Sequence, residues 1–411
     1  MKFGVFYELQ LPKPWKEGDE HRLFQEALEQ IVLADKLGID HAWAVEHHFL
    51  DEYSHCSSPE VFLAAAAGQT KNIRLGHGIR QVIPNYNHPA RTAEGLATLD
   101  LVSNGRVDFG IGEGATRLEL GGFDIPARQK RAMAIEAAEQ VANMMVMTPY
   151  PGFEGEHFSM PCRNVLPKPL QTPHPPMWMA CTNRDTIKIA ASLGVGALAF
   201  SFLDQDEAKA WADIYYGIIK SEACVPVGHS VNANIAIVSN FSLHKDREEA
   251  IRRGQVNFEF FGYAMNALVA GDTVPGRTNL WGDYIAQHGS KTEDLIASVK
   301  RARTHVSGIG TPDDLAGHIA EFEEAGVDQI IFLQQAGRNL HTNICESLEL
   351  FAADVMPAFK AKQAAKQKAK TAELAPYIEA ALARKTFMKP LADDEIPVVR
   401  ASVKSAQIAG T

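Results

Sequence analysis

The 411-residue chain has few cysteines, no excess of basic residues and no long apolar segment. Its five cysteines are scattered, odd in number and without a CxxC pair, so neither a disulfide framework nor a thiolate zinc site is expected. A reducing cytoplasm is the simplest compartment for such a chain. The formal net charge of −10 disfavours a nucleic-acid partner, which needs a basic surface. Because no apolar run approaches the length of a membrane span, no membrane partner is expected either.

Short apolar segments with strand character alternate with amphipathic helical patterns along most of the chain. Strands are expected at 2–8, 40–46, 73–79, 106–112, 176–181, 196–202, 232–239 and 328–334. Helices are expected at 21–38, 58–70, 88–105, 126–147, 184–193, 205–221, 245–262, 312–325 and 342–356. Alternation of this kind implies a parallel sheet. Eight strand–helix units fit a (β/α)8 TIM barrel better than a doubly wound open sheet, although periodicity alone does not exclude the latter.

Two internal segments and the C-terminal end depart from this alternation. Residues 149–176 are rich in Pro and Gly and are expected to form a loop excursion rather than a helix. Residues 263–310 form a second irregular insertion, and long loops of this kind are often lids or binding segments. The barrel is therefore assigned to 1–356. Residues 357–411 are expected to form an exposed, solvated helix and a tail outside the barrel, with a docking role for the tail as the alternative.

The sequence Glu46-His47-His48-Phe49 lies at the end of the second expected strand. In a barrel, active-site groups come from the carboxyl ends of the strands and the loops that follow. Adjacent residues of an extended chain point to opposite sides, and no further ligands stand at metal-site spacing, so His47 and His48 are not expected to bind a metal. Either one imidazole faces the barrel mouth as an acid, base or hydrogen-bond donor, or one histidine is buried and the other merely solvated.

The segment 109–115, FGIGEGA, places Gly112 and Gly114 at the end of the fourth expected strand. It fits the pattern GxGxxA, but a dinucleotide fingerprint needs a following strand with an acid about twenty residues on, where a helix is expected here. The two glycines are better explained by a close approach of the backbone to a flat ring or a phosphate.

A further strand runs into a helix at Cys181-Thr182-Asn183. The free N–H groups of the first turn would suit a phosphate, and an ordinary helix cap without a ligand is the alternative. Arg128 and Arg131, at the start of the helix after the fourth strand, would either reach such a phosphate or lie on the surface.

Taken in order, these segments resemble the bacterial luciferase-like flavin monooxygenases, a family that includes the luciferase α chain and the type II Baeyer–Villiger diketocamphane enzymes. The resemblance covers roughly residues 1–356 and depends on the order and spacing of several motifs. These are MKFGVF (1–6), EHHF (46–49), LGHGIRQVIPNYNHPARTAE (75–94), LVSNGRVDFGIGEG (101–114), VLPKPLQTPHPPMWMA (165–180) and IGTPDDLAGHIAEFEEAGVDQIIF (309–332). The family fold is a (β/α)8 barrel, in agreement with the pattern.

The resemblance implies roles for the histidines and for the end of the third strand. His47 matches the histidine held to act as the catalytic acid–base in luciferase, and His48 matches its neighbour. In the family, the third strand ends in a non-prolyl cis peptide under the isoalloxazine ring, a costly conformation that would serve function. The residues within which that bond would fall, and which would contact the cofactor, are His77, Gly78, Ile79 and Arg80.

The resemblance also implies a phosphate site. Cys181, Thr182 and Asn183, together with Asp185, match the turn that receives the flavin phosphate. Arg131 matches an arginine on the phosphate side.

Two positions depart from luciferase. Gly112 stands where luciferase has a reactive cysteine, and Glu113 stands where it has an arginine. An acid near the flavin phosphate would be repulsive. Either Glu113 turns away, or the phosphate is held differently, by Arg117, Arg128 or Arg184.

The substrate pocket is expected to be aromatic and mainly apolar. The candidates for its lining, each of which would equally suit packing, are Tyr7, Glu8, Trp43, Phe49, Tyr53, Arg80, Phe202 and Trp281.

The activity implied by the resemblance is that of a two-component monooxygenase. Such an enzyme takes reduced FMN from a separate flavin reductase and uses O2 to oxygenate a small apolar substrate, such as an aldehyde, ketone or terpenoid, through a peroxyflavin. One alternative is an F420-dependent hydride-transfer oxidoreductase on the same barrel, and another is a flavin-binding protein without catalysis. Family habit further implies a homodimer with early helices in the interface.

Overall fold

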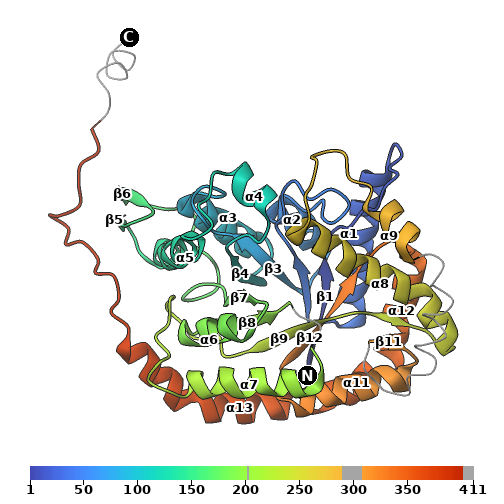
Figure 1. Ribbon diagram of the computed structural model, residues 1–411. Coiled ribbons are helices and arrows are strands. Elements are labelled where there is room, and N and C mark those ends of the chain that lie inside the picture. The colour runs from blue at the N-terminus through green and yellow to red at the C-terminus, as the bar shows by residue number, and fades with distance from the viewer. Residues whose placement is uncertain (201–202, 289–307, 401–411) are drawn as a thin grey trace.

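Eight parallel strands close into a barrel in the computed structural model, which describes residues 1–200, 203–288 and 308–400 (Figure 1). Neighbouring strands follow the order β1, β2, β3, β4, β7, β8, β9 and β12, and β12 pairs with β1 to close the ring. The strands are β1 (Lys2–Tyr7), β2 (His41–Ala44), β3 (Arg74–Gln81), β4 (Val107–Gly112), β7 (Met177–Cys181), β8 (Gly196–Ala199), β9 (Ile235–Ser239) and β12 (Gln329–Gln334). The expected (β/α)8 barrel is confirmed, and the doubly wound sheet is excluded.

Helices connect the strands and cover the outside of the barrel (Figure 1). Proline is the first residue of three of them, at Pro59, Pro89 and Pro312, where the missing N–H is not needed. Left-handed residues follow several helix ends, for example Gly38 in one case and Asn104 and Gly105 in another. The helices are α1 (Asp19–Leu37), α2 (Pro59–Ala67), α3 (Pro89–Val102), α4 (Arg117–Gly122), α5 (Lys130–Val146), α6 (Arg184–Ser192), α7 (Gln205–Ile219), α8 (Arg247–Ala270), α9 (Leu280–His288), α11 (Pro312–Glu324), α12 (His341–Asp354) and α13 (Met356–Arg384).

Both internal insertions contain more regular structure than expected. The Pro- and Gly-rich excursion holds an antiparallel hairpin of β5 (Tyr150–Glu154) and β6 (Ser159–Arg163). In the second insertion, α8 continues to Ala270 and α9 follows, while residues 289–307 lie outside the described residues. A two-stranded parallel sheet of β10 (Ser242–Leu243) and β11 (Ile309–Gly310) joins the two flanks of this insertion. Helical structure, rather than a loop, therefore brings the second insertion over the barrel mouth.

The C-terminal extension begins with α13, which lies along α7 and α11 at the end of the barrel where the strands start (Figure 1). Lys360 pairs with Asp40, just before β2, and Lys370 pairs with Asp328, just before β12. Four apolar residues of α13 are buried, among them Phe359 and Leu374, while most of its other positions are exposed. The helix is therefore docked on one side, rather than solvated throughout as expected. Residues 401–411 lie outside the described residues.

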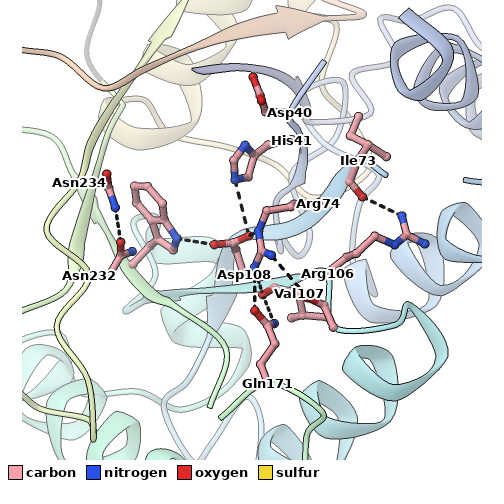
Figure 2. A network of polar contacts seen from close by, with 12 residues as sticks. Asp40, His41, Ile73, Arg74, Arg106, Val107, Asp108, Gln171, Asn232 and Asn234 are labelled. Carbon is pink, nitrogen blue, oxygen red and sulfur yellow. Dashed lines mark hydrogen bonds and ion pairs between the residues drawn. The ribbon is translucent and has the colours of Figure 1, made fainter. Parts of the chain in front are cut away.

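Side chains fill the half of the barrel that lies near the amino ends of the strands. Figure 2 shows the polar network around Asp108 in this region. The rings of Trp43 and Trp178 meet edge to face at 5.4 Å. A Cβ on Gly76 would lie 2.1 Å from the Trp43 ring, so glycine makes room for this packing. Below them, Asp108 accepts hydrogen bonds from Arg74 Nε at 2.6 Å and from Trp178 Nε1 at 2.9 Å. The packing leaves open space at the opposite end, where the strands finish.

Within the described ranges, the helices are too short or too polar to cross a bilayer.

Candidate active site

A cavity of about 590 Å³ lies at the carboxyl ends of the strands. Active sites occupy this end in (β/α)8 barrel enzymes. Its surface is mainly apolar, with charged residues gathered in two places. The inward-facing apolar residues that form the floor are Phe6, Ile79, Ile111, Met179, Leu198 and Ile331.

His47 borders the cavity just beyond the end of β2. Its backbone N–H bonds to Cys56 O at 2.9 Å, and its Nδ1 lies 2.8 Å from Glu119 Oε1. Burial alone would lower the pKa of His47, but the charges of Glu119 and Glu8 outweigh burial and raise the pKa to about 9. Because Nδ1 is held by Glu119, Nε2 is the nitrogen directed at the other groups of the cavity. The imidazole is therefore a proton donor at neutral pH.

Glu119 is a buried carboxylate on α4, a short helix that was not predicted from the sequence. It forms a capping box with Thr116, whose hydroxyl donates to Glu119 Oε2 at 2.9 Å. Its Oε1 also accepts the backbone N–H of His48 at 3.2 Å. Burial would raise the pKa of Glu119, but the charge and hydrogen bond of His47 lower it. The sequence signal that would have located this residue is the capping pattern Thr-x-x-Glu at 116–119.

Glu8, one residue beyond β1, lies on the other side of His47. Its Oε2 is 3.7 Å from His47 Nε2, and its Oε1 accepts a hydrogen bond from Tyr53 at 3.1 Å. The side chain is 1% exposed and borders the cavity. Burial raises the pKa of Glu8 to about 7, although the charge of His47 acts in the opposite direction.

His48 turns away from the cavity. Its Nε2 lies 3.2 Å from Glu46 Oε1, and its ring stacks on Tyr86 and meets the edge of Phe123. Glu46 also pairs with Arg80 and accepts the N–H of Gln81, in a cluster outside the barrel lumen. His47 therefore borders the cavity, whereas His48 packs outside it.

The end of β3 differs from the expectation in two respects. The expected non-prolyl cis peptide within residues 77–80 is wrong, because the cis bonds of the described residues all precede proline. Instead, the pairing of β3 with β4 shifts register between His77 and Arg80. Gly78 and Ile79 border the cavity, whereas His77 and Arg80 do not. Arg80 bonds to Glu60 and Asn87, and burial lowers the pKa of His77 to about 3.

One end of the cavity is polar and cationic. Lys130 and Arg131 from α5 meet Thr182, Asn183 and Thr186 from the β7–α6 turn. The two glycines expected near a ring or phosphate, Gly112 and Gly114, border the same region.

Two other residues of the expected phosphate turn do not reach this end. Cys181 is buried outside the cavity lining, with its Sγ 3.4 Å from Met179 O. Asp185 is exposed and pairs with Lys188. The side chain of Asn183 accepts from the N–H groups of Asp185 and Thr186, so the helix is capped by its own residues.

Glu113 does not turn away from this end. Its carboxylate forms two hydrogen bonds with Arg131, at 2.8 and 3.0 Å, and lies 3.5 Å from Lys130. The three arginines considered as replacements do not border the cavity: Arg117 and Arg128 are exposed, and Arg184 pairs with Glu207. The acid is therefore neutralised by its own neighbours.

Some of the remaining candidates for the pocket lining border the cavity, and the others lie outside it. Tyr53 borders the cavity, as Glu8 does, whereas Tyr7 is buried against Phe62 outside it. Phe49 is 56% exposed and packs on Phe123. Trp43 belongs to the filled half of the barrel, and Trp281 packs on Phe260 and Arg338. Phe202 lies outside the described residues. The end of α8 forms one wall of the cavity, with residues that were not predicted from the sequence: Met265, Asn266, Leu268 and Val269.

The cavity suits a flat heteroaromatic ring that carries a phosphate chain. The apolar floor would take the ring, and Arg131, Lys130 and Thr182 would face the phosphate. A Cβ on Gly112 would lie 2.0 Å from the end of the Ile79 side chain, so glycine lets Ile79 lie close to the β4 backbone beneath the ring position. In the described part of the chain, no three His, Cys, Asp or Glu side chains are grouped to hold a metal ion. Fold and site together indicate a barrel enzyme in which His47 borders a cavity with an apolar floor and a cationic end.

The chain belongs to the luciferase-like monooxygenase family, whose model matches residues 1–329. The oxygenase component of the flavin-dependent trigonelline monooxygenase of Acinetobacter baylyi is 24% identical over 372 residues, covering 87% of this chain and 96% of that protein. The alkanal monooxygenase alpha chain of Photorhabdus luminescens is 24% identical over 374 residues, covering 88% of this chain and 99% of that protein.

Solved structures share the fold. Monooxygenase RslO1 from Streptomyces bottropensis has a TM-score of 0.70 and 26% identity, over 87% of this chain and 100% of that one. The oxygenating constituent of 3,6-diketocamphane monooxygenase from Pseudomonas putida, a type II Baeyer–Villiger enzyme in complex with FMN, has a TM-score of 0.63 and 21% identity, over 87% and 98%. The coenzyme F420-dependent tetrahydromethanopterin reductase of Methanopyrus kandleri has a TM-score of 0.60 and 21% identity, over 87% and 99%.

Proposed function

We propose that this protein is the oxygenase component of a two-component monooxygenase that uses reduced FMN and O2 to oxygenate a small, mainly apolar substrate. The observation that carries the proposal is the position of His47, a charged proton donor held by Glu119 at the border of an apolar cavity with a cationic end. When bound, reduced FMN would supply the electrons with which O2 is activated. A separate flavin reductase would deliver it.

Residues of the protein would bind and orient the cofactor and protect the reacting centre from water. Arg131 and Lys130 would hold the phosphate, and the apolar floor with Met265 and Leu268 would exclude water from the reacting centre. His47 Nε2 would donate a proton to an oxygen that develops negative charge, and Glu119 would keep the ring oriented and protonated.

Transfer of one oxygen atom from O2 tests this proposal. Protein saturated with chemically reduced FMN is mixed with 18O2 and a panel of aldehydes, ketones, terpenoids and phenols, and the products are analysed by mass spectrometry. We expect one 18O atom in a product that forms only with protein present. FMN binding without incorporation across the panel would contradict the proposal.

A pair of histidine variants tests the assignment of the acid. His47→Ala should lower turnover by about 10²- to 10⁴-fold while leaving FMN affinity within about twofold of wild type. His48→Ala is the matched control, because its ring packs outside the cavity. Equal losses of turnover in the two variants would remove His47 from the mechanism.

F420-dependent hydride transfer is the second candidate, and the structural likeness to an F420-dependent reductase favours its inclusion. That cofactor donates hydride and does not activate O2. Titration of the protein with FMN and with F420, followed by intrinsic fluorescence, separates the two. Tighter binding of F420 would replace the monooxygenase proposal.

The proposal extends to assembly and compartment. Val61 of α2 and Leu101 and Val102 of α3 are exposed apolar side chains on neighbouring early helices, which supports a homodimer through this face. The five cysteines are all unpaired, as expected of a protein that works in the reducing cytoplasm.

A further inference from the structure

The carboxylate of Glu8 has one oxygen without a hydrogen-bond partner. Oε1 accepts from Tyr53, but Oε2 has no partner among the described residues, although it is buried at the cavity. Buried polar atoms are nearly always paired, because an unmade hydrogen bond leaves the desolvation cost uncompensated. Since Glu8 borders the cavity, a ligand atom can complete the pairing.

His47 presents a complementary atom beside this oxygen. Its Nδ1 is taken by Glu119, so Nε2 is the nitrogen left for a ligand. The 3.7 Å between Nε2 and Glu8 Oε2 is too long for a direct hydrogen bond. A ligand oxygen set beside the gap would lie about 2.8 Å from both atoms, which is ordinary hydrogen-bond distance. The pair therefore offers one donor and one acceptor to a single oxygen.

Only certain oxygens satisfy both atoms at once. A hydroxyl donates its proton to the carboxylate and accepts from the imidazolium, whereas a carbonyl or ether oxygen can only accept. Above about pH 7, where Glu8 is charged, a carbonyl would leave Oε2 unpaired and facing a lone pair. The surroundings favour an aromatic ring behind the hydroxyl, because Phe6 and Phe200 border the same part of the cavity and their rings lie 5.5 Å apart.

We propose that Glu8 and His47 together recognise a phenolic hydroxyl, so that the substrates are mainly apolar molecules carrying a phenol. This inference rests on the proposed function and narrows its substrate class. It also gives Glu8 a chemical role. The phenol O–H bond breaks, a bond forms between that proton and Glu8 Oε2, and the electron pair stays on the phenolic oxygen beside the charged His47. Nothing is oxidised or reduced in this step, and the ring becomes richer in electrons.

The groups that face Glu8 are suited to this transfer. A free phenol has a pKa of about 10. Burial raises the pKa of Glu8 to about 7, which makes it a stronger base than an exposed carboxylate. The positive charge of His47 favours the phenolate, whereas the negative charge of Glu119 opposes it, and the hydroxyl of Tyr53 stabilises the charged form of Glu8.

Binding of paired probes tests the recognition step without turnover. FMN affinity is first measured for wild type, Glu8→Leu and Glu8→Gln, and equal values show that the fold and the cofactor site are intact. Calorimetry on the FMN-saturated proteins then compares 4-ethylphenol with ethylbenzene. We expect wild type to prefer the phenol by about tenfold or more, which is the effect of a hydrogen bond to a charged group. Glu8→Leu should abolish this preference.

The amide variant separates a hydroxyl from a carbonyl. Glu8→Gln gains an N–H donor, so it should bind 4-methylbenzaldehyde better than wild type does and 4-ethylphenol less well. Asn266→Ala, which changes another polar group of the cavity, should leave the ratio of phenol to ethylbenzene unchanged. An equal affinity of wild type for the two probes, or a phenol preference that survives in Glu8→Leu, would overturn the proposal.

Proton transfer has its own measurement. 4-Cyanophenol is a more acidic phenol than 4-ethylphenol, and benzonitrile and ethylbenzene are the matching compounds without the hydroxyl. In wild type, the gain in affinity from 4-ethylphenol to 4-cyanophenol should exceed the gain from ethylbenzene to benzonitrile. Glu8→Leu should lose this excess. Failure of the broader proposal is visible separately, in the first titration with FMN or in the absence of oxygen incorporation. If FMN does not bind, the same comparison on the cofactor-free protein decides whether Glu8 recognises a phenol.

Discussion

Glu119 Oε1 lies 2.8 Å from Nδ1 of His47. A carboxylate with no exposure to solvent therefore fixes this imidazole, which is the one of the two in Glu46-His47-His48-Phe49 that borders the cavity. The arrangement joins two segments that are 72 residues apart in the chain. The charge of His47 therefore depends on Glu119 of α4, and not on the histidine motif alone.

Glu119→Gln should lower the pKa of His47 from about 9, because the main charge that opposes burial is removed. Turnover should fall by about tenfold or more, and its alkaline limb should move to lower pH. The measurement is the pH profile of oxygenation, supported by NMR titration of His47. Glu94→Gln removes a charge from a surface pair with Arg91 and serves as the control. An unchanged alkaline limb would contradict the assignment.

The His47–Glu119 pair also predicts a dependence of folding stability on pH. The pKa of His47 is higher in the folded chain than its ordinary value of 6.5, so its contribution is complete below that value and is lost as the pH rises through about 9. The pKa of Glu119 is lowered from 4.5, so its contribution is lost as the pH falls below that value. The difference in unfolding free energy between wild type and Glu119→Gln, about 1–3 kcal/mol, should therefore be largest between these limits. Urea unfolding at several pH values measures it, and a difference that grows above pH 9 would be inconsistent with the pair.

Glu113→Gln should tighten the binding of FMN, by about five- to tenfold at low salt, because Arg131 and Lys130 would then face the phosphate without a competing carboxylate. Riboflavin, which lacks the phosphate, should bind with unchanged affinity. Glu207→Gln is the matched control, since it breaks a similar pair with Arg184 away from the cavity. Fluorescence titration of both ligands decides the matter, and weaker FMN binding by Glu113→Gln would show that the acid supports the phosphate site.

Glu52→Gln should loosen α9. The buried carboxylate accepts the backbone N–H groups of Lys13 at 2.9 Å, Leu280 at 2.7 Å and Trp281 at 3.0 Å, and an amide has only one oxygen for these three donors. We expect a loss of about 1–3 kcal/mol in unfolding free energy and faster hydrogen exchange in 280–288. Asp51→Asn, which alters a pair with the Lys13 side chain that is nearer the surface, should have a smaller effect. Unchanged exchange in α9 would refute the anchoring role.

Val61→Glu should convert the proposed dimer into a monomer. A charge within an apolar interface is left buried and unpaired, which few interfaces tolerate. Val274→Glu is an instructive control, because both valines are 66% exposed but Val274 lies far along the chain from α2 and α3. Light scattering after size-exclusion chromatography measures the mass of each variant. A dimer that survives in Val61→Glu would exclude this face.

The barrel was predictable because its buried parallel strands carry apolar runs, such as the four residues 330–333 of β12, and because glycine and proline mark the helix ends. The position of His47 followed from the strand-end rule. The orientation of residues 77–80 did not, since one shift of register between His77 and Arg80 decides which side chains face inward.

Other parts of the site depend on contacts between distant segments. Glu119 stands on a helix of six residues, which is too short to show a helical period. Met265 and Leu268 reach the cavity because α8 continues past the point where its sequence pattern weakens. Pairing of Glu113 with Arg131 was not foreseen, because it requires the end of β4 and the start of α5 to meet side by side.

The anchor at Glu52 has a consequence for how this enzyme can change over generations. It holds α9 through main-chain N–H groups, which every residue except proline supplies, rather than through particular side chains. Substitutions along α8 and α9 can therefore reshape the wall formed by Met265 and Leu268 without detaching it. The barrel offers a main-chain attachment for an exchangeable wall, so substitutions there can change what the cavity admits while His47 and the cationic end stay as they are.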